Sequence, residues 1–255
     1  MKLDIIPTVL DADGIDYPTT DGQPMAENMW QWEWIVLLKQ NIGRLVKDRD
    51  DVLVASDNLI YPVRGNTAVS IAPDVFVAFG RPNGLRACYK VWQEDDLFPQ
   101  VVMEVLSPSN TSREMERKRL AYENWGVREY TVIDPDAESV VIYERHGDEL
   151  TLVDDPYQHV SPLLGLRFEI DANRKLRVIG PDDRIFFKFL EADELAERER
   201  DRADDETLRA DQERLRADDQ TLRADQERLR ADAEVVKREK LAAKLRELGL
   251  DPDAL

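Results

Sequence analysis

The hydrophobic positions of the first part of the chain switch between helical and extended spacing. Between Met29 and Leu45, apolar residues recur at intervals of three and four, which predicts a helix from about Ala26 to Lys47. Three runs rich in β-branched residues follow, each bounded by polar residues, glycine or proline: VLVASDNLIYPV from Val52, APDVFVAF from Ala72 and QVVMEVLS from Gln100. We therefore expect a helix followed by extended segments.

The next segments repeat this alternation. SREMERKRLAYENW, from Ser112, has helical composition and stops before Gly126, a suitable residue for a C-terminal cap. EYTVIDP and VVIYER then predict two strands, and TLVDD and RFEID predict further β structure. This order of elements is typical of an α/β domain.

The pattern changes abruptly between Leu190 and Asp193. From Glu191 onward there is no aromatic residue, and Ala, Arg, Leu, Asp and Glu dominate, which is the composition of a long helix. The sequence therefore predicts two domains, a globular domain over residues 1–190 and a charged helical tail over residues 191–255.

A heptad repeat runs through this tail. Near-copies of LRADQER place leucines seven residues apart, at Leu208, Leu215, Leu222 and Leu229. The positions three or four residues further on would complete an apolar seam, but they are polar: Asp211, Gln212, Asp218, Asp219, Asp225 and Gln226. Acid–arginine pairs four residues apart would support a solvated single helix. Two alternatives stay open, a charged helix without a specific partner and a weak homodimer or partner-helix contact through the coiled-coil-like tail.

Composition restricts the possible partners and the compartment. The 53 Asp plus Glu outnumber the 35 Lys plus Arg, and the formal charge of -18 opposes nonspecific binding to nucleic acid or to an anionic membrane. No apolar stretch approaches the roughly 18 to 20 residues of a membrane span, and the first residues lack a secretion pattern. Cys88 is the single cysteine, so no intrachain disulfide can form. We expect a cytoplasmic protein without a membrane partner.

Several kinds of catalytic site are not supported. His146 and His159 have no cysteine partners at zinc-binding spacing, and the sequence has neither a nucleophile elbow nor a glycine-rich phosphate loop. Two carboxylates stand out instead. Asp74 precedes the apolar run VFVAF, and Glu104 interrupts the apolar run VVMEVL, where a lone carboxylate is costly unless it is compensated. On adjacent strands the two could hold Mg²⁺ or Mn²⁺; alternatively, Glu104 pairs with a basic core residue and Asp74 caps a turn.

These segments together resemble a known family. APDVFVAF, VVMEVLSPSN, a helix with Lys118 and Tyr122 four residues apart, NWGVREYTVIDP and VVIYER follow the order seen in the cyanobacterial type of the Uma-two family, within the PD-(D/E)xK nuclease superfamily. The resemblance covers roughly residues 24 to 170 and excludes the tail. It implies a restriction-endonuclease-like core with a mixed central β-sheet flanked by helices.

The resemblance also implies roles for individual residues. Asp74 and Glu104 match the metal-binding acids, and the backbone carbonyl of Val105 matches a third ligand for Mg²⁺ or Mn²⁺. Leu106 stands where the superfamily usually has its lysine, so the catalytic lysine is expected on the following helix, at Lys118. Glu27 matches a further acid of such sites. Without the resemblance, Lys118 would be a solvated helix residue and Glu27 an ordinary first-turn acid.

A basic patch on the second helix indicates where nucleic acid would bind. It consists of Arg113, Arg117 and Arg119 beside Lys118. The expected function is metal-dependent phosphodiester hydrolysis, with DNA as the substrate of an endonuclease that uses a metal-bound water. The tyrosines Tyr122 and Tyr130 are interpreted as packing residues. The rival interpretation is a catalytically silent adaptor that meets its partner through the tail, which the acidic balance favours.

Overall fold

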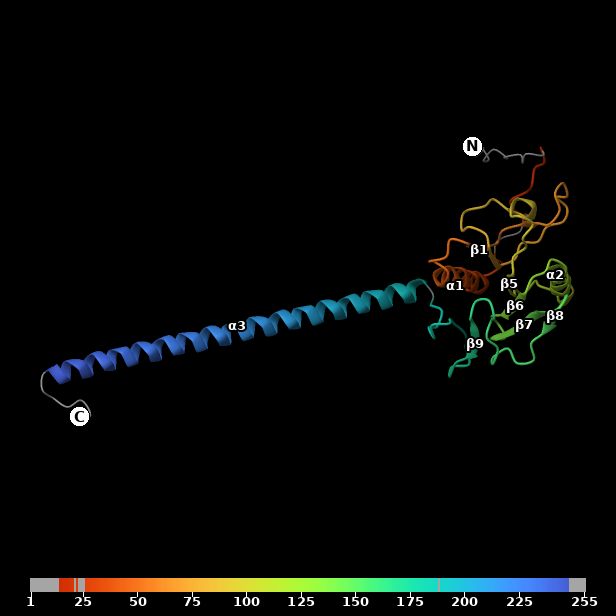
Figure 1. Ribbon diagram of the computed structural model, residues 1–255. Coiled ribbons are helices and arrows are strands. Elements are labelled where there is room, and N and C mark those ends of the chain that lie inside the picture. The colour runs from red at the N-terminus through yellow and green to blue at the C-terminus, as the bar shows by residue number, and fades with distance from the viewer. Residues whose placement is uncertain (1–13, 21, 23–25, 188, 248–255) are drawn as a thin grey trace, which may run out of the picture. The chain divides into compact units, whose positions relative to one another are not determined.

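The computed structural model of the 255-residue protein describes residues 14–20, 22, 26–187 and 189–247 (Figure 1). Its contacts divide the chain into two compact units, Met1–Glu191 and Ala192–Leu255. The expected fold class is confirmed, since the first unit has a mixed central sheet flanked by helices and a long helix follows it. Residues 1–13 and 248–255, at the ends of the two expected domains, lie outside the described residues.

The central sheet has six strands in the order β1-β3-β5-β6-β7-β8. They span Val52–Ser56, Val75–Phe79, Val101–Val105, Glu129–Asp134, Ser139–His146 and Glu149–Leu152. The β5–β6 pair is parallel and the other neighbours are antiparallel. A parallel pair needs a crossover, and helix α2 (Ser112–Asn124) provides it. The strand β5, which carries Glu104, is therefore central and buried along its whole length.

The two helices of the first unit cover different faces of this sheet (Figure 1). Helix α1 (Met29–Leu45) buries Ile35, Leu38 and Ile42 in a core cluster with one set of alternate strand residues. Tyr122 of α2 lies in a second cluster with the other set, which includes Val102 of β5. Because side chains alternate along a strand, each residue of β5 faces one helix or the other.

The run that begins at Val52 is not one continuous strand. Asp57 has a φ of 45°, in the left-handed region, and the chain turns there before β2 (Ile60–Tyr61). Strand β2 leaves the main sheet and pairs in parallel with β4 (Tyr89–Lys90), ahead of a short 3₁₀ helix at Val91–Gln93. A further antiparallel pair consists of β9 (Arg167–Ile170) and β10 (Leu176–Ile179).

Local signals fix both ends of α2. The side chain of Thr111 accepts a hydrogen bond from the backbone N–H of Glu114, which caps the first turn. At the other end Gly126 has a φ of 80°, the left-handed conformation in which glycine meets no steric penalty. The length of α2, and with it the position of Lys118 and Tyr122 relative to β5, is thus set by the sequence at its termini.

The second unit is dominated by helix α3, which runs without interruption over Phe189–Glu247. Its apolar side chains are widely spaced among charged ones, and Leu215 and Leu229 are 70% and 68% exposed. The side chains of Leu208 and Leu222 lie outside those described. No helix among the described residues has the length and apolar character needed to cross a bilayer.

The face of α1 toward the sheet should carry most of its contribution to stability. We expect Leu38→Ala to lower the free energy of unfolding by about 2–5 kcal/mol, because Leu38 is fully buried and its loss leaves a cavity. Urea unfolding followed by circular dichroism measures the effect, and the neighbouring exposed residue gives the control Lys39→Ala. Equal small losses in the two variants would contradict this packing.

Candidate active site

Strand register brings two acids to the same level of the sheet. The antiparallel pairing of β3 with β5 sets Val75 opposite Met103, and Asp74 and Glu104 are the next residues outward. The backbone N–H of Val105 donates a hydrogen bond of 2.6 Å to Oδ2 of Asp74. The structure thus places Asp74, Glu104 and Val105 together, as the sequence predicts.

Glu104 is a carboxylate inside the core, with only 2% of its surface exposed. Met103 and Val105 face α1, so Glu104 faces α2 with Val102. Its Oε2 lies 2.9 Å from Nζ of Lys118, and its Oε1 accepts a hydrogen bond of 2.5 Å from the hydroxyl of Tyr122. Both oxygens therefore have partners, as a buried carboxylate requires.

One face of α2 supplies both of these partners. Lys118 and Tyr122 are four residues apart, so their side chains lie one above the other on the helix. Tyr122 is fully buried, and the side chain of Lys118 is 18% exposed at the edge of the core. The ion pair of Glu104 with a basic residue, which the sequence offered as the alternative to a metal site, is therefore present in this structure.

The three ionisable groups of the site shift one another's pKa values. Burial, and then the negative charge of Glu104, raise the pKa of Asp74 to about 8. Burial alone would lower the pKa of Lys118, but the attraction of Glu104 outweighs it and the pKa is raised. Burial and the same carboxylate raise the pKa of the Tyr122 hydroxyl well above its usual range, so it stays a hydrogen-bond donor. At neutral pH the half-buried Asp74 is therefore mostly protonated, and the ammonium of Lys118 balances the charge of the buried Glu104.

The donor atoms fit a hard divalent cation. The carboxylates of Asp74 and Glu104 and the carbonyl of Val105 are all oxygen ligands of the kind that Mg²⁺ and Mn²⁺ prefer. The carbonyl of Val105 accepts one hydrogen bond, 3.0 Å long, from Nε2 of Gln31, which leaves a second lone pair. Among the described residues no three His, Cys, Asp or Glu side chains form a metal-binding group. Water would therefore have to complete the coordination of any ion held by these two acids.

Glu27 precedes Asn28, the N-cap of α1, so it is not a first-turn acid, and it contacts the loop that follows β5. Its carboxylate accepts a hydrogen bond from the hydroxyl of Ser109, which lowers the pKa of this exposed group. The backbone N–H of Glu27 donates a hydrogen bond of 2.9 Å to Oε1 of Gln31. Because Nε2 of the same amide binds Val105, Gln31 connects the backbone of Glu27 with the backbone of β5.

The predicted basic patch divides into two parts. Arg113 and Arg117 are exposed on α2. Arg119 instead pairs with Glu116 at 2.8 Å and Glu123 at 3.0 Å, and its guanidinium lies 5.7 Å from the ring centre of Tyr143. Two of the three arginines are thus available to a ligand, whereas the third is held by its own helix and strand β7.

Sequence reasoning missed two polar residues of this site. Tyr122 was interpreted as a packing residue, and it does pack, but its hydroxyl also fixes Glu104. Gln31 was not singled out, although a signal exists: it precedes Ile35 and Leu38 at helical spacing and is 7% exposed, so it is a polar residue on the buried face of α1.

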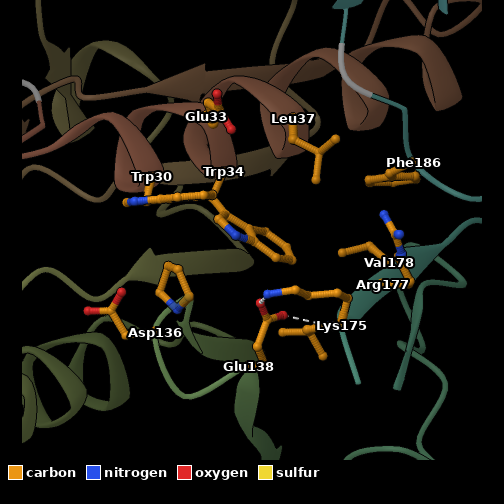
Figure 2. Close-up of a pocket in the computed structure, with 12 residues that line it drawn as sticks. Trp30, Glu33, Trp34, Leu37, Asp136, Glu138, Lys175, Arg177, Val178 and Phe186 are labelled. Carbon is orange, nitrogen blue, oxygen red and sulfur yellow. Dashed lines mark hydrogen bonds and ion pairs between the residues drawn. The ribbon is translucent and has the colours of Figure 1, made fainter. Parts of the chain in front are cut away.

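A separate cavity of about 410 Å³ lies elsewhere in the first unit. Figure 2 shows its lining, with Trp30 and Trp34 from α1 above the Lys175–Glu138 ion pair of 2.6 Å. Neither Asp74 nor Glu104 nor Lys118 contributes to it. Lys175 is paired with Glu138, and Arg177 is paired with Asp171 outside the lining, so the acids beside β5 remain the better candidate for chemistry.

Fold and site together define a restriction-endonuclease-like α/β protein with a buried acidic site. A family model described as "Putative restriction endonuclease", Uma2, matches residues 17–173. The chain belongs to this Uma2 family. The tail lies beyond the match.

One solved structure that is similar comes from Anabaena variabilis ATCC 29413, and it is described as "a putative nuclease belonging to DUF820". It is 18% identical, with a TM-score of 0.41, and the match covers 56% of this chain and 79% of that chain. No curated protein matches the chain.

The raised pKa of Asp74 should make the metal-free protein sensitive to alkali. The folded state keeps a proton on Asp74 that the unfolded chain loses near pH 4, so stability should fall as the pH rises from about 4 to about 8. Asp74→Asn removes this effect, and in EDTA at pH 9 it should be more stable than the wild type by roughly 1–3 kcal/mol. Urea unfolding at several pH values measures the difference. Parallel pH profiles for the two proteins would contradict the assignment.

The buried ion pair predicts a second, reciprocal effect. Lys118→Met should destabilise the protein by about 3–5 kcal/mol at neutral pH, because Glu104 is left buried without a cation. The double variant Glu104→Gln, Lys118→Met should regain most of that loss, because the neutral amide can still accept a hydrogen bond from Tyr122. The free energies of unfolding of the four proteins complete the cycle. A double variant no more stable than Lys118→Met would contradict the coupling.

Proposed function

We propose that this protein is a metal-dependent phosphodiester hydrolase that cuts DNA as an endonuclease. The observation that supports it is the pair of acids at β5: Asp74 and Glu104 lie beside the single ammonium of Lys118, and the pKa of Asp74 is raised to about 8. A site that holds two carboxyl groups so close together, at a cost shown by the raised pKa of Asp74, is suited to a divalent cation. Family membership supports the same class of activity.

The proposed ligands are the carboxylates of Asp74 and Glu104 and the carbonyl of Val105, for Mg²⁺ or Mn²⁺. Such an ion, when bound, neutralises charge on the phosphoryl oxygens and lowers the pKa of a bound water. Tyr122 keeps Glu104 in one rotamer through its hydrogen bond. Gln31 holds the carbonyl of Val105 in the same way from the α1 side.

Lys118 has two parts in this proposal. With no ion bound, its ammonium compensates Glu104 at 2.9 Å. With substrate bound, the same group sits beside the acids, where it can orient an attacking water and stabilise negative charge on the phosphate. Its raised pKa keeps it protonated at neutral pH, so it acts as an electrostatic group and hydrogen-bond donor.

Glu27 and the exposed arginines complete the proposed site. The hydrogen bond from Ser109 lowers the pKa of Glu27, so its carboxylate is ionised at neutral pH and can accept a hydrogen bond from a water near the loop after β5. Arg113 and Arg117, exposed on α2, are assigned to the DNA backbone. Arg119 would assist less, because it is already paired within α2.

The acidic surface favours a second candidate, a silent nuclease-fold adaptor. The net charge of -18 repels nucleic acid at long range, and Lys118 already compensates Glu104 without a metal. In either case we assign the chemistry of the site to residues 1–190 and any assembly to residues 191–255. A cytoplasmic location, where Cys88 stays reduced, belongs to both proposals.

A plasmid assay tests the enzyme. Supercoiled DNA at low salt with Mg²⁺ or Mn²⁺ should be nicked by the wild type, whereas Asp74→Ala and Glu104→Gln should reduce the rate by at least about a hundredfold. The matched control is Glu129→Gln, which changes another buried carboxyl group, on the adjacent strand β6, that is bound by Ser161 and Leu163. EDTA should abolish the activity.

Metal binding separates the two candidates. Calorimetric titration with Mn²⁺ should show binding to the wild type and to Glu129→Gln, and none to Glu104→Gln. Nicking that persists in Glu104→Gln would remove Glu104 from the mechanism. Folded wild-type protein that neither binds Mn²⁺ nor nicks DNA would select the adaptor.

A further inference from the structure

Helix α3 exposes a narrow apolar stripe, and Val235 and Leu241 are exposed outside it. Leu215, Leu229 and Val236 are separated by multiples of seven residues, and all three are largely exposed, at 70%, 68% and 48%. A helix that repeats its apolar residues every seven positions presents them along a single gently winding line. In heptad notation this line is position d.

The charges beside the stripe are sorted by sign. On one side, at position e, each heptad between residues 209 and 244 has a basic residue: Arg209, Arg216, Arg223, Arg230, Lys237 and Lys244. On the other side, at position g, the residues between 211 and 239 are acidic, and those with described side chains are Asp211, Asp225, Asp232 and Glu239. The stripe is therefore bordered by a positive edge and a negative edge along the same length of helix.

These two edges cannot neutralise each other within one helix. Positions e and g lie on opposite sides of d, and pairs within a helix form only at spacings of three or four. The intrahelical ion pair seen here is of that kind, Arg223 with Asp219 at 2.8 Å. If these charged residues served solubility alone, acidic and basic residues could be mixed on both edges, because a mixed charged surface is equally soluble.

We propose that α3 forms a parallel, in-register, two-stranded coiled coil with a second copy of this chain. In that arrangement each g residue meets the e residue of the next heptad on the other helix. Asp211 then faces Arg216 of the partner subunit, and Asp225 faces Arg230 of the partner subunit. In an antiparallel pair the same helices would set acid against acid and base against base, which is repulsive along both edges.

The polar residues at position a favour two strands. Position a contains Gln212, Asp219, Gln226 and Lys240, with Ala233 as its one apolar residue in this range; polar side chains there lower stability but fix the register and the number of helices. In a parallel dimer in register each glutamine meets its own copy and can share a hydrogen bond. Asp219 is partly neutralised by Arg223 in its own helix, which reduces the repulsion between the two copies. The two parallel helices are related by two-fold symmetry only when they are in register.

This inference does not depend on the proposed nuclease activity. Its structural consequence follows from the order of the chain alone. In a parallel pair both helices begin at the same end, so the two globular units, each of which precedes its α3, are attached at that end. A dimer of this kind contains two copies of the acidic site.

Sedimentation equilibrium of the full-length chain at low salt tests the charge pairing. The wild type should be a dimer that weakens as salt rises. In a g variant, Asp211, Asp225, Asp232 and Glu239 are changed to Lys. Its dimer dissociation constant should be at least about tenfold higher than that of the wild type, so it should be monomeric at concentrations where the wild type is a dimer. An e variant, with Arg216, Arg230, Lys237 and Lys244 changed to Glu, should behave likewise. An equimolar mixture of the two should dimerise again, which shows that both helices still fold.

Disulfide formation tests orientation and register in a Cys88→Ser background. Oxidised Leu215→Cys and Val236→Cys should each form a covalent dimer, because residues at d face their own copies. Ala217→Cys, at position f on the outer face, is the matched control and should not. A monomeric wild type at 100 times the concentration of the cross-linking assay would overturn the proposal. The two cysteine variants can also be mixed before oxidation. A disulfide between position 215 of one helix and position 236 of the other, with no disulfide between identical positions, would overturn the proposal in favour of an antiparallel pair.

Discussion

The position of one buried carboxylate constrains the whole globular unit. Glu104 interrupts a central strand that is otherwise apolar, and its charge is tolerated only because α2 delivers Lys118 and Tyr122 to its two oxygens. Those partners must be one helical turn apart, so the start of α2 and its end before Gly126 are tied to the register of β5 and β6. The parallel crossover thus fixes both the fold and the site.

Asp74 shows that this arrangement is not optimised for stability. A neutral side chain at the end of β3 could still accept the hydrogen bond from Val105, without the repulsion from Glu104 that helps raise the pKa of Asp74 to about 8. Local conflict of this sort is typical of functional sites, where the chain holds groups in positions that a ligand rather than the fold satisfies. Asp74, whose ionised form the fold disfavours and a bound cation would favour, is the physical link between the fold and the proposed metal.

The sequence predicted the acids better than it predicted their supports. Asp74 and Glu104 break apolar runs, so they are visible in one dimension, and the resemblance added Lys118 by its order in the motif series. Tyr122 and Gln31 support the site through hydrogen bonds to β5, which is distant from each of them in the sequence. A local sequence pattern does not reveal which group a hydroxyl or an amide will bind. The turn at Asp57 was missed for a related reason, because a left-handed aspartate inside a β-rich run depends on where the following segment packs.

The tail shows the opposite case. Its charge pattern can be read in full from the sequence, but the role of that pattern becomes clear only when a second helix is considered. Taken alone, Asp and Gln at the positions flanking each leucine break an apolar seam and favour a solvated helix. The signs at e and g change that judgement. A base at e can pair with an acid of its own helix, as Arg223 does with Asp219, but the acids at g and the bases at e can meet only across a second helix. Between identical helices they meet only when the helices are parallel. The polar seam then accounts for a reversible association, and the sorted edges account for its direction.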